Sequence, residues 1–294
     1  MVSALRYSSP DETPSISKSI RDANAVIQMI SQIDEVSKKF YKYRSMSGDS
    51  LNWVEKTVLQ NEIFFASASS FNDPFDLRPS FTLEASDSRR REDYLRLSRK
   101  FEPHLNERQR KHDVDLVMSS SLSATNLADT TATIQALHNF QISNAIGVLC
   151  VSAKRDDILM WSHYSDSHRG VCLEFDGRGT LMEHAQKVQY SHIRVPINPY
   201  DDDNEKAMSK ALLTKSAQWS YEDEWRLIRY QQGPGVASFN PRNLTGIIIG
   251  ALASNSTIEI IRSWIRQRSL PLDVYRASVS GSKFELKIDS FKRL

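Results

Sequence analysis

The sequence has little cysteine and no long apolar run, and each shortage excludes a class of protein. Only Cys150 and Cys172 occur in 294 residues, with no Cys-x-x-Cys spacing. Both stand in apolar, strand-like runs, where a buried thiol acts as a small hydrophobic side chain. We therefore expect a reducing compartment, without a disulfide framework. No segment approaches the roughly 20 apolar residues of a membrane span, and the N-terminal residues are polar, so we expect a cytoplasmic protein with no membrane partner.

An excess of one charge is also missing. The chain has 38 basic and 36 acidic side chains, a net charge of +2. This balance gives no general attraction to nucleic acid or to anionic lipid. A local basic patch lies within residues 88–112. The 40% of hydrophobic residues is typical of a globular chain, and the length allows a sizeable core.

The chain divides into a tail and one domain. Residues 1–20 are rich in Ser and Pro, which predicts a flexible tail, and residues 21–294 are predicted to form a single domain. Residues 86–141 are dense in charge and lack a strand pattern, so we expect a helical insertion or lid there, with a Ser/Thr-rich break inside it. Elsewhere strands and helices mix without regular βαβ alternation. The fold class is therefore α+β, with a mixed, mainly antiparallel sheet.

The periodicity of apolar residues places the individual elements. Strands are expected at 40–45, 62–70, 146–152, 171–175, 187–191, 224–230, 244–251, 272–278 and 283–288. The strand at 244–251 is almost wholly apolar, which indicates burial of both faces. Helices are expected at 21–39, 51–61, around 157–164, at 206–219 and at 257–269.

The first of three polar–aromatic motifs is FNDPFD, at 71–76. Asn-Asp-Pro favours a turn, because the residue before proline is driven out of the helical region. Asp73 and Asp76 flank this turn, and we interpret Phe71 and Phe75 as packed anchors. The two carboxylates serve either as caps of the turn or as ligand contacts in a pocket wall.

The second motif is WSHYSDSHRG, at 161–170. On a helix, the spacing of Trp161 and Tyr164 puts both on one face. Two histidines beside a Trp and an Arg in a loop indicate a functional wall, although a lone histidine is usually structural. His163 and His168 are five residues apart, which does not match the four-residue spacing of a zinc-binding helix.

The third motif, WSYEDEWR at 219–226, carries Glu222 and Glu224 at the start of a strand. Period-two alternation points both carboxylates to one side, which is costly unless a cation or a ligand lies between them. The alternative is a pair of solvated acids, or of acids paired with Arg226 and Arg229. Alternation also sends Trp225 toward the core. We expect the three motifs to meet at one site.

With these motifs in this order, the chain resembles a bacterial family with the domain of unknown function 2971. The shared pattern is Lys42-Tyr43-Arg44, then FNDPFD, then Trp161 to Tyr164 with His168-Arg169-Gly170, and Tyr221 to Arg226. The resemblance covers roughly residues 40–290. It implies no activity, and it implies a role as a bacterial defence or toxin component.

A second, looser resemblance is to ADP-ribosyltransferases of the Arg-Ser-Glu type, which would imply split sheets and NAD as substrate. It assigns Arg44 to the NAD phosphates and Ser152 to orienting the catalytic carboxylate. It assigns Glu224 to the ribose and to the oxocarbenium-like charge, and Glu222 to deprotonating the acceptor. Ser152 stands in Val-Ser-Ala where the pattern has Ser-Thr-Ser, and Ser162 is an equal candidate.

The leading hypothesis is therefore an NAD-consuming, ADP-ribosyltransferase-like enzyme with no metal. Its acceptor is an unknown macromolecule, a protein or a nucleic acid, selected by the insertion. Glu224, Glu222 and Arg44 are the candidate catalytic residues, and the candidate NAD contacts are Arg44, Ser152, Ser162, Trp161, Tyr164, His163, Asp73, Asp76 and Trp219.

Two alternatives belong to other functional classes. One is a metal-dependent nuclease or phosphoesterase that uses Asp73, Asp76, His163, His168 and Glu222. The other is a non-catalytic sensor or binding module in phage defence.

Overall fold

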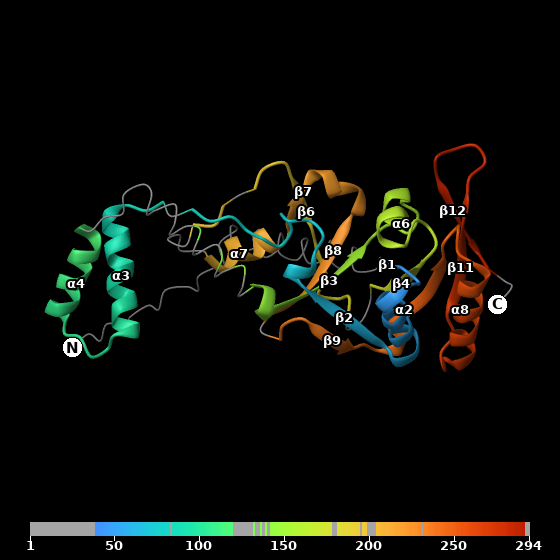
Figure 1. Ribbon diagram of the computed structural model, residues 1–294, viewed down its shortest axis with the longest axis horizontal. Helices are drawn as coiled ribbons and strands as arrows, with labels where there is room; N and C mark the ends of the chain where they lie inside the picture. Colours follow the sequence, from blue (N-terminus) through green and yellow to red (C-terminus); the bar gives the residue numbers. More distant parts are fainter. Residues whose placement is uncertain are drawn as a thin grey trace, which may run out of the picture.

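The computed structural model describes residues 39–82, 84–119, 132, 136, 139, 142–177, 181–194, 196–198, 204–230 and 232–291. The expected tail, almost all of the expected helix at 21–39, and most of the Ser/Thr-rich break lie outside these residues. The described part is a mainly antiparallel mixed sheet with helices around it, which confirms the α+β class (Figure 1).

One large sheet follows the strand order β12-β11-β10-β4-β1-β3-β2-β9, with β8 paired to β3 and β5 to β8. Only β10 and β11 run parallel within it. Its strands are β1 (Lys39–Arg44), β2 (Glu62–Ser67), β3 (Ile146–Ser152), β4 (Val171–Asp176), β5 (Gln186–Lys187), β8 (Glu224–Tyr230), β9 (Gly235–Ser238), β10 (Leu244–Ile249), β11 (Asp273–Val279) and β12 (Leu286–Ser290).

The sheet forks at β3. Along its whole length β3 pairs with β8, from Ile146 opposite Tyr230 to Ser152 opposite Glu224. It also pairs with β1 at one end, through Ser152 and Tyr41, and with β2 toward the other end, through Val148. Because β8 pairs with β3 along its whole length, β1 and β2 share the other edge of β3 and separate from each other. The space between them, which we call the fork, contains the cavity described below.

Several helices pack around the sheet. They are α2 (Gly48–Glu55), which continues as a π-helical turn (Lys56–Gln60), α6 (Ile158–Tyr164), α7 (Asn204–Leu212) and α8 (Asn255–Gln267). Two further helices, α3 (Asp87–Phe101) and α4 (Glu107–Ser119), lie side by side and apart from the sheet (Figure 1). Both fall within the segment expected to be a helical insertion.

Strand β10 shows why the core needs two layers. Ile247 and Ile249 pack in one apolar cluster together with Ile261 and Trp264 of α8. Ile248, between them, packs on the other face with Tyr43 and Trp161. Both faces are thus covered, as the unbroken apolar run predicts.

The expected helix at 206–219 is wrong beyond Leu212. Two carbonyls that a continuing helix would use are taken elsewhere: Leu212 O accepts from Arg226 at 2.7 Å, and Leu213 O accepts from Gln189 N at 2.7 Å. The chain instead forms β7 (Thr214–Ser216), which pairs in parallel with β6 (Gln189–Ser191). A 3-10 helix (Ala217–Glu222) follows, so Glu222 is not a strand residue as expected. The short edge strand β9 is also not expected from the sequence.

Two glycines hold the second motif against the sheet. A Cβ on Gly170 would come 2.1 Å from the carbonyl oxygen of Arg44, and one on Gly250 would come 2.2 Å from the carbonyl oxygen of His168. Just before Gly170, the residues Asp166, Ser167 and His168 all have positive φ, of 47°, 50° and 67°. This motif is therefore a tight backbone junction as well as a wall of the cavity.

Gly170→Ala tests that junction. The added methyl group meets backbone atoms that cannot rotate away, so we expect a loss of about 1–3 kcal/mol or more in the free energy of unfolding. Gly281→Ala is the control, because nothing lies within 4 Å of its Cβ position. Urea denaturation curves of equal midpoint for the two variants would contradict the close contact.

Candidate functional site

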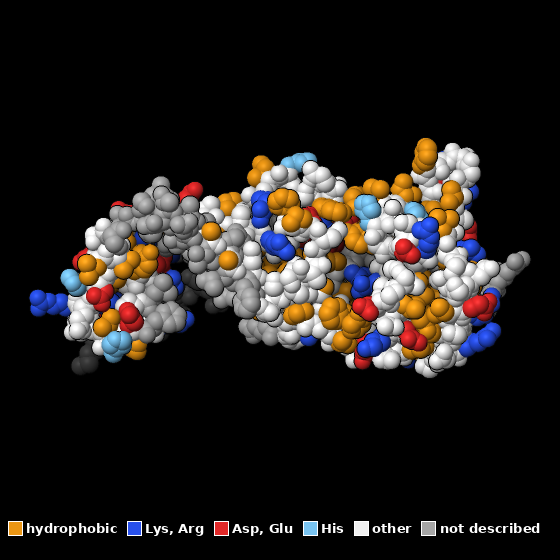
Figure 2. Space-filling view, viewed as in Figure 1, with side chains coloured by type: hydrophobic (Ala, Val, Ile, Leu, Met, Phe, Trp, Pro, Cys, Tyr) orange, Lys and Arg blue, Asp and Glu red, His pale blue; other side chains and the backbone are white. Residues whose placement is uncertain are grey.

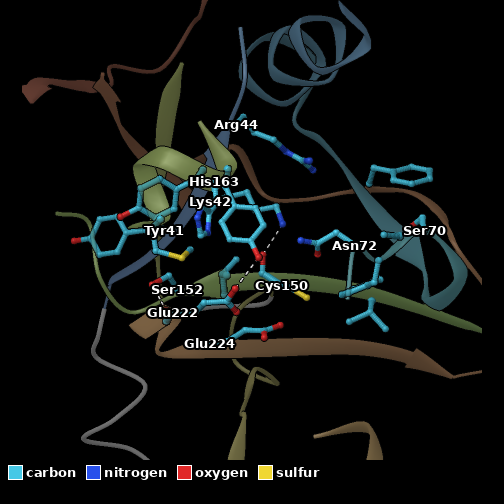
Figure 3. A pocket seen from close by; sticks show the side chains of 18 of the residues that line it. Tyr41, Lys42, Arg44, Ser70, Asn72, Cys150, Ser152, His163, Glu222 and Glu224 are labelled. Atoms are coloured by element: carbon cyan, nitrogen blue, oxygen red, sulfur yellow. Dashed lines mark hydrogen bonds between the residues drawn. The ribbon is translucent and has the colours of Figure 1, made fainter. Parts of the chain in front are cut away.

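A cavity of about 520 Å³ lies in the fork between β1, β2 and β3 (Figure 3). Its lining contains residues of all three motifs: Phe71, Asn72, His163, Tyr164, Glu222 and Glu224. Arg44 and Lys42 of β1 also line it. In Figure 3, Arg44 lies on the opposite side of the hollow from Glu222 and Glu224. The volume is in the range of ordinary small-molecule sites.

Glu222 and Glu224 converge on one cation, Lys215. Its Nζ donates to Glu222 Oε2 at 2.5 Å and to Glu224 Oε2 at 3.0 Å. Both carboxylates are only 3% exposed, so the alternative of two solvated acids is wrong. Glu222 reaches this position from the end of a 3-10 helix and Glu224 from the start of β8, with Asp223 between them at φ 41°. The left-handed residue, rather than strand alternation, brings the two side chains together.

Arg226 completes the buried charge cluster. Its Nη2 donates to both oxygens of Asp76 at 2.8 Å, and its Nε donates to Glu224 Oε1 at 2.8 Å. Lys215 also lies 3.4 Å from Asp76. Three carboxylates and two cations leave a formal charge of −1 when all are ionised, and all five residues are buried. Arg229 is not a partner of either glutamate, because it hydrogen-bonds Gln232.

This cluster separates the acidities of the two glutamates. Burial opposes ionisation of Glu224, but Arg226 and Lys215 outweigh it and lower the pKa of Glu224 to about 2. Burial also raises the pKa of Glu222, where Lys215 and the Tyr164 hydroxyl only partly offset it and anionic Glu224 adds to it. The pKa values of the two adjacent carboxylates are therefore shifted in opposite directions, downward at Glu224 and upward at Glu222.

The same shifts predict the pH dependence of stability. The folded-state pKa of Glu224 is depressed, so its contribution is present above the unfolded value near 4.5 and is lost as pH falls toward 2. Between pH 6 and pH 3 we expect wild type to lose about 2 kcal/mol more stability than Glu224→Gln. The raised pKa of Glu222 acts in the opposite direction. Urea titrations of both proteins at the two pH values measure the difference; equal losses would contradict a depressed pKa.

The wall that β1 contributes to the cavity is cationic. Lys42 donates to the carbonyl of Cys150 at 2.7 Å, and burial, together with neighbouring Arg44, lowers its pKa to about 8. Burial also lowers the pKa of Arg44. In the described part of the chain, no carboxylate forms an ion pair with the Arg44 guanidinium. An anionic group of a ligand would supply an ion-pair partner for Arg44.

Helix α6 supplies the aromatic side of the cavity. Tyr164 donates to Glu222 Oε1 at 2.6 Å, and His163 Nδ1 lies 2.9 Å from the Tyr221 hydroxyl. Trp161 is fully buried beneath them against Tyr43 and does not line the cavity. Trp219 lies outside the lining too, with its ring 5.2 Å from Lys215 Nζ.

The candidate serines differ in position. Ser152 lines the cavity, but its Oγ donates to the backbone carbonyl of Glu222 at 2.5 Å and not to a carboxylate. It therefore positions the main chain of the third motif. Ser162 is not among the lining residues.

In FNDPFD, buried Asp73 accepts from Phe75 N at 2.8 Å, as a turn cap does, and Asp76 pairs with Arg226 below the cavity. The interpretation of Phe75 as a packed anchor is wrong, because this side chain is 60% exposed. The turn closes through its capped backbone without needing that ring in the core.

The residue that sequence reasoning missed is Lys215. Two like charges call for a cation, and the nearby arginines were the obvious candidates. Lys215 falls inside an expected helix, where its side chain has no reason to meet a carboxylate seven residues further on. Only the ending of α7 at Leu212 directs it to the carboxylates.

The metal-dependent alternative has no donor set in the described part of the chain. No group of three or more His, Cys, Asp and Glu side chains there is arranged to hold an ion. Asp76 and Glu222 point at Lys215 or Arg226, and His168 is not among the residues that line the cavity.

Comparison with known proteins supports the first resemblance in part. Residues 160–227 match the family described as "Protein of unknown function (DUF2971)". This stretch contains α6 from Met160 onward, Lys215 and both glutamates, whereas Arg44 and FNDPFD lie outside it. The chain has no significant match among curated proteins or solved structures, so these comparisons give no support to the resemblance to ADP-ribosyltransferases. Within the described residues, no helix has the length and apolar character to cross a bilayer.

Proposed function

We propose that the fork cavity binds NAD and that the protein transfers ADP-ribose from it to an acceptor. The observation that carries the proposal is the pair Glu222 and Glu224. Two adjacent carboxylates whose pKa values are driven in opposite directions are suited to separate roles in one reaction. Arg44, from β1, faces them across the same cavity (Figure 3).

Glu224 would provide the fixed negative charge. Arg226 and Lys215 hold its carboxylate in place, so little reorganisation is needed as positive charge develops on the ribose. The bond between C1′ and the nicotinamide nitrogen breaks, and nicotinamide leaves with the electron pair. Arg44 would hold the phosphates at the far wall.

Glu222 would take the proton of the acceptor. As the acceptor oxygen or nitrogen bonds to C1′, its proton passes to the Glu222 carboxylate, whose raised pKa suits it to this transfer. Tyr164 and Lys215 fix the two oxygens of that carboxylate. The strands that carry Arg44, Ser152 and Glu224 are direct neighbours, β1-β3-β8, which also supports the assignment.

The decisive experiment incubates the full chain with nicotinamide-labelled and adenylate-labelled NAD in separate reactions, with a cell extract as the source of acceptors. We expect free labelled nicotinamide in the first and a labelled macromolecule in the second. No release of nicotinamide under any condition would sink the proposal and leave the non-catalytic sensor as the better explanation.

Arg44→Gln tests the phosphate contact. Loss of the guanidinium is expected to weaken NAD binding by about tenfold or more, because charge-assisted hydrogen bonds are the strong ones. Arg44 has no ion-pair partner in the described part of the chain, so the fold should persist. Calorimetric titration of NAD measures the affinity, and Arg242→Ala, an exposed arginine, serves as the control. An unchanged affinity would remove Arg44 from the site.

A further inference from the structure

A second cavity, of about 600 Å³, lies on the other side of Lys215. It is formed by the chain after FNDPFD, the loop after β6, the end of α7 and β7. Its walls are tied together, because Ile197 N donates to Ser80 O at 2.8 Å and Thr82 N donates to Ile197 O at 2.9 Å. The cavity is therefore built into the fold rather than formed by loose loops.

The charged side chains in the described lining of this cavity are all basic. Its described lining carries Arg78, Arg194, Lys210 and Lys215, together with His192, and no carboxylate. Neither Arg78 nor Lys210 forms an ion pair with a residue that the structure describes. Figure 2 shows Lys and Arg side chains gathered beside exposed apolar ones in the region of β6 and β7. The protein as a whole is nearly neutral, so this concentration is local.

The exposed aromatic ring of Phe75 also lines this second cavity. Phe75 is 60% exposed and lies 5.4 Å from the guanidinium of Arg194. The FNDPFD turn closes through its capped backbone, so its packing gives no reason for an aromatic side chain at position 75. Aromatic rings beside cations are the usual platform for an unpaired base with its phosphate.

We propose that the second cavity binds a nucleotide unit, with its phosphate on Arg78 and Lys210 and its base against Phe75. Because Lys215 lines both cavities and contacts Glu222, a nucleotide here lies beside the carboxylate assigned to the acceptor. A role as the acceptor of ADP-ribose rests on the proposed function, whereas the binding itself does not.

The test measures binding without NAD, so its failure is separate from failure of the transferase proposal. The full chain is titrated into a fluorescently labelled single-stranded oligonucleotide, and anisotropy is followed at several salt concentrations. We expect Phe75→Ala to weaken binding about tenfold. We expect the double variant Arg78→Ala/Lys210→Ala to weaken it at least as much and to lower the salt slope by about one or two.

Arg266→Ala, an exposed arginine on α8, is the matched control and should bind as wild type does. Competition by adenosine monophosphate identifies the source: equal affinity indicates a free nucleotide, and an oligonucleotide at least about tenfold tighter indicates a strand. Absence of binding would overturn the proposal. So would equal affinity in all variants, or equal binding of a polyglutamate peptide.

Discussion

Arg226→Ala is expected to remove about 3–5 kcal/mol from the free energy of unfolding at neutral pH. The guanidinium is fully buried and bonds Asp76, Glu224 and the carbonyl of Leu212. Truncation leaves two buried carboxylates, Asp76 and Glu224, without their main partner. That loss is a large share of the 5–15 kcal/mol by which a typical domain is stable against unfolding. A partly unfolded Arg226→Ala variant at room temperature would therefore also agree with the prediction.

The control for this prediction lies three residues further on the same strand. Half-buried Arg229 contacts Gln232 and the ring of Phe65 and has no carboxylate partner among the described residues, and Arg229→Ala should cost about 1 kcal/mol. Arg226→Lys separates charge from geometry, because lysine keeps the charge but cannot bond both carboxylates through a planar fork. Chemical denaturation of the three variants measures the series, and equal midpoints for Arg226→Ala and Arg229→Ala would contradict the buried network.

Glu224→Gln is expected to lower nicotinamide release from NAD by at least about a hundredfold, while NAD affinity changes little. The amide keeps the shape of the side chain and can still accept from Arg226, so the cavity should persist. What disappears is the fixed negative charge opposite the developing oxocarbenium ion. Release of nicotinamide in single-turnover experiments measures the effect directly.

Glu222→Gln gives the matched comparison for that experiment. Since Glu222 is assigned to the acceptor proton, its loss should abolish labelling of the macromolecule while leaving slow hydrolysis of NAD by water. Equal effects of both variants on nicotinamide release would contradict the division of roles. Circular dichroism of both proteins would show whether a loss of fold explains the result.

The sheet was largely predictable, because its strands carry local signals. The apolar run of β3 and the unbroken one of β10 were placed within two residues of their observed bounds. The end of α7 was not predictable, since it depends on a hydrogen bond from Arg226, fourteen residues later. Strand β9 was missed because it has only four residues and its Val236 side chain is 43% exposed, so it carries little local signal.

The candidate site was predictable only in part, because some of the expected residues line the cavity whereas others, such as Ser162 and Trp219, do not. Motif density pointed to Glu222, Glu224 and Tyr164, which do line one cavity. Nothing local showed that Lys215 would bridge the glutamates or that Ser152 would hold a backbone carbonyl. Such contacts are made between separate elements, whereas sequence patterns report mainly on one element at a time.

The close fit of Gly170 against Arg44 has a consequence for choosing variants. The main chain of Arg44 rests on a residue without a side chain, and Gly250 in turn supports that loop. Neither glycine lines the cavity. A mutational screen restricted to residues near a bound ligand would therefore pass over two positions that fix where the cationic wall stands, and random mutagenesis should recover them as loss-of-function sites remote from any ligand.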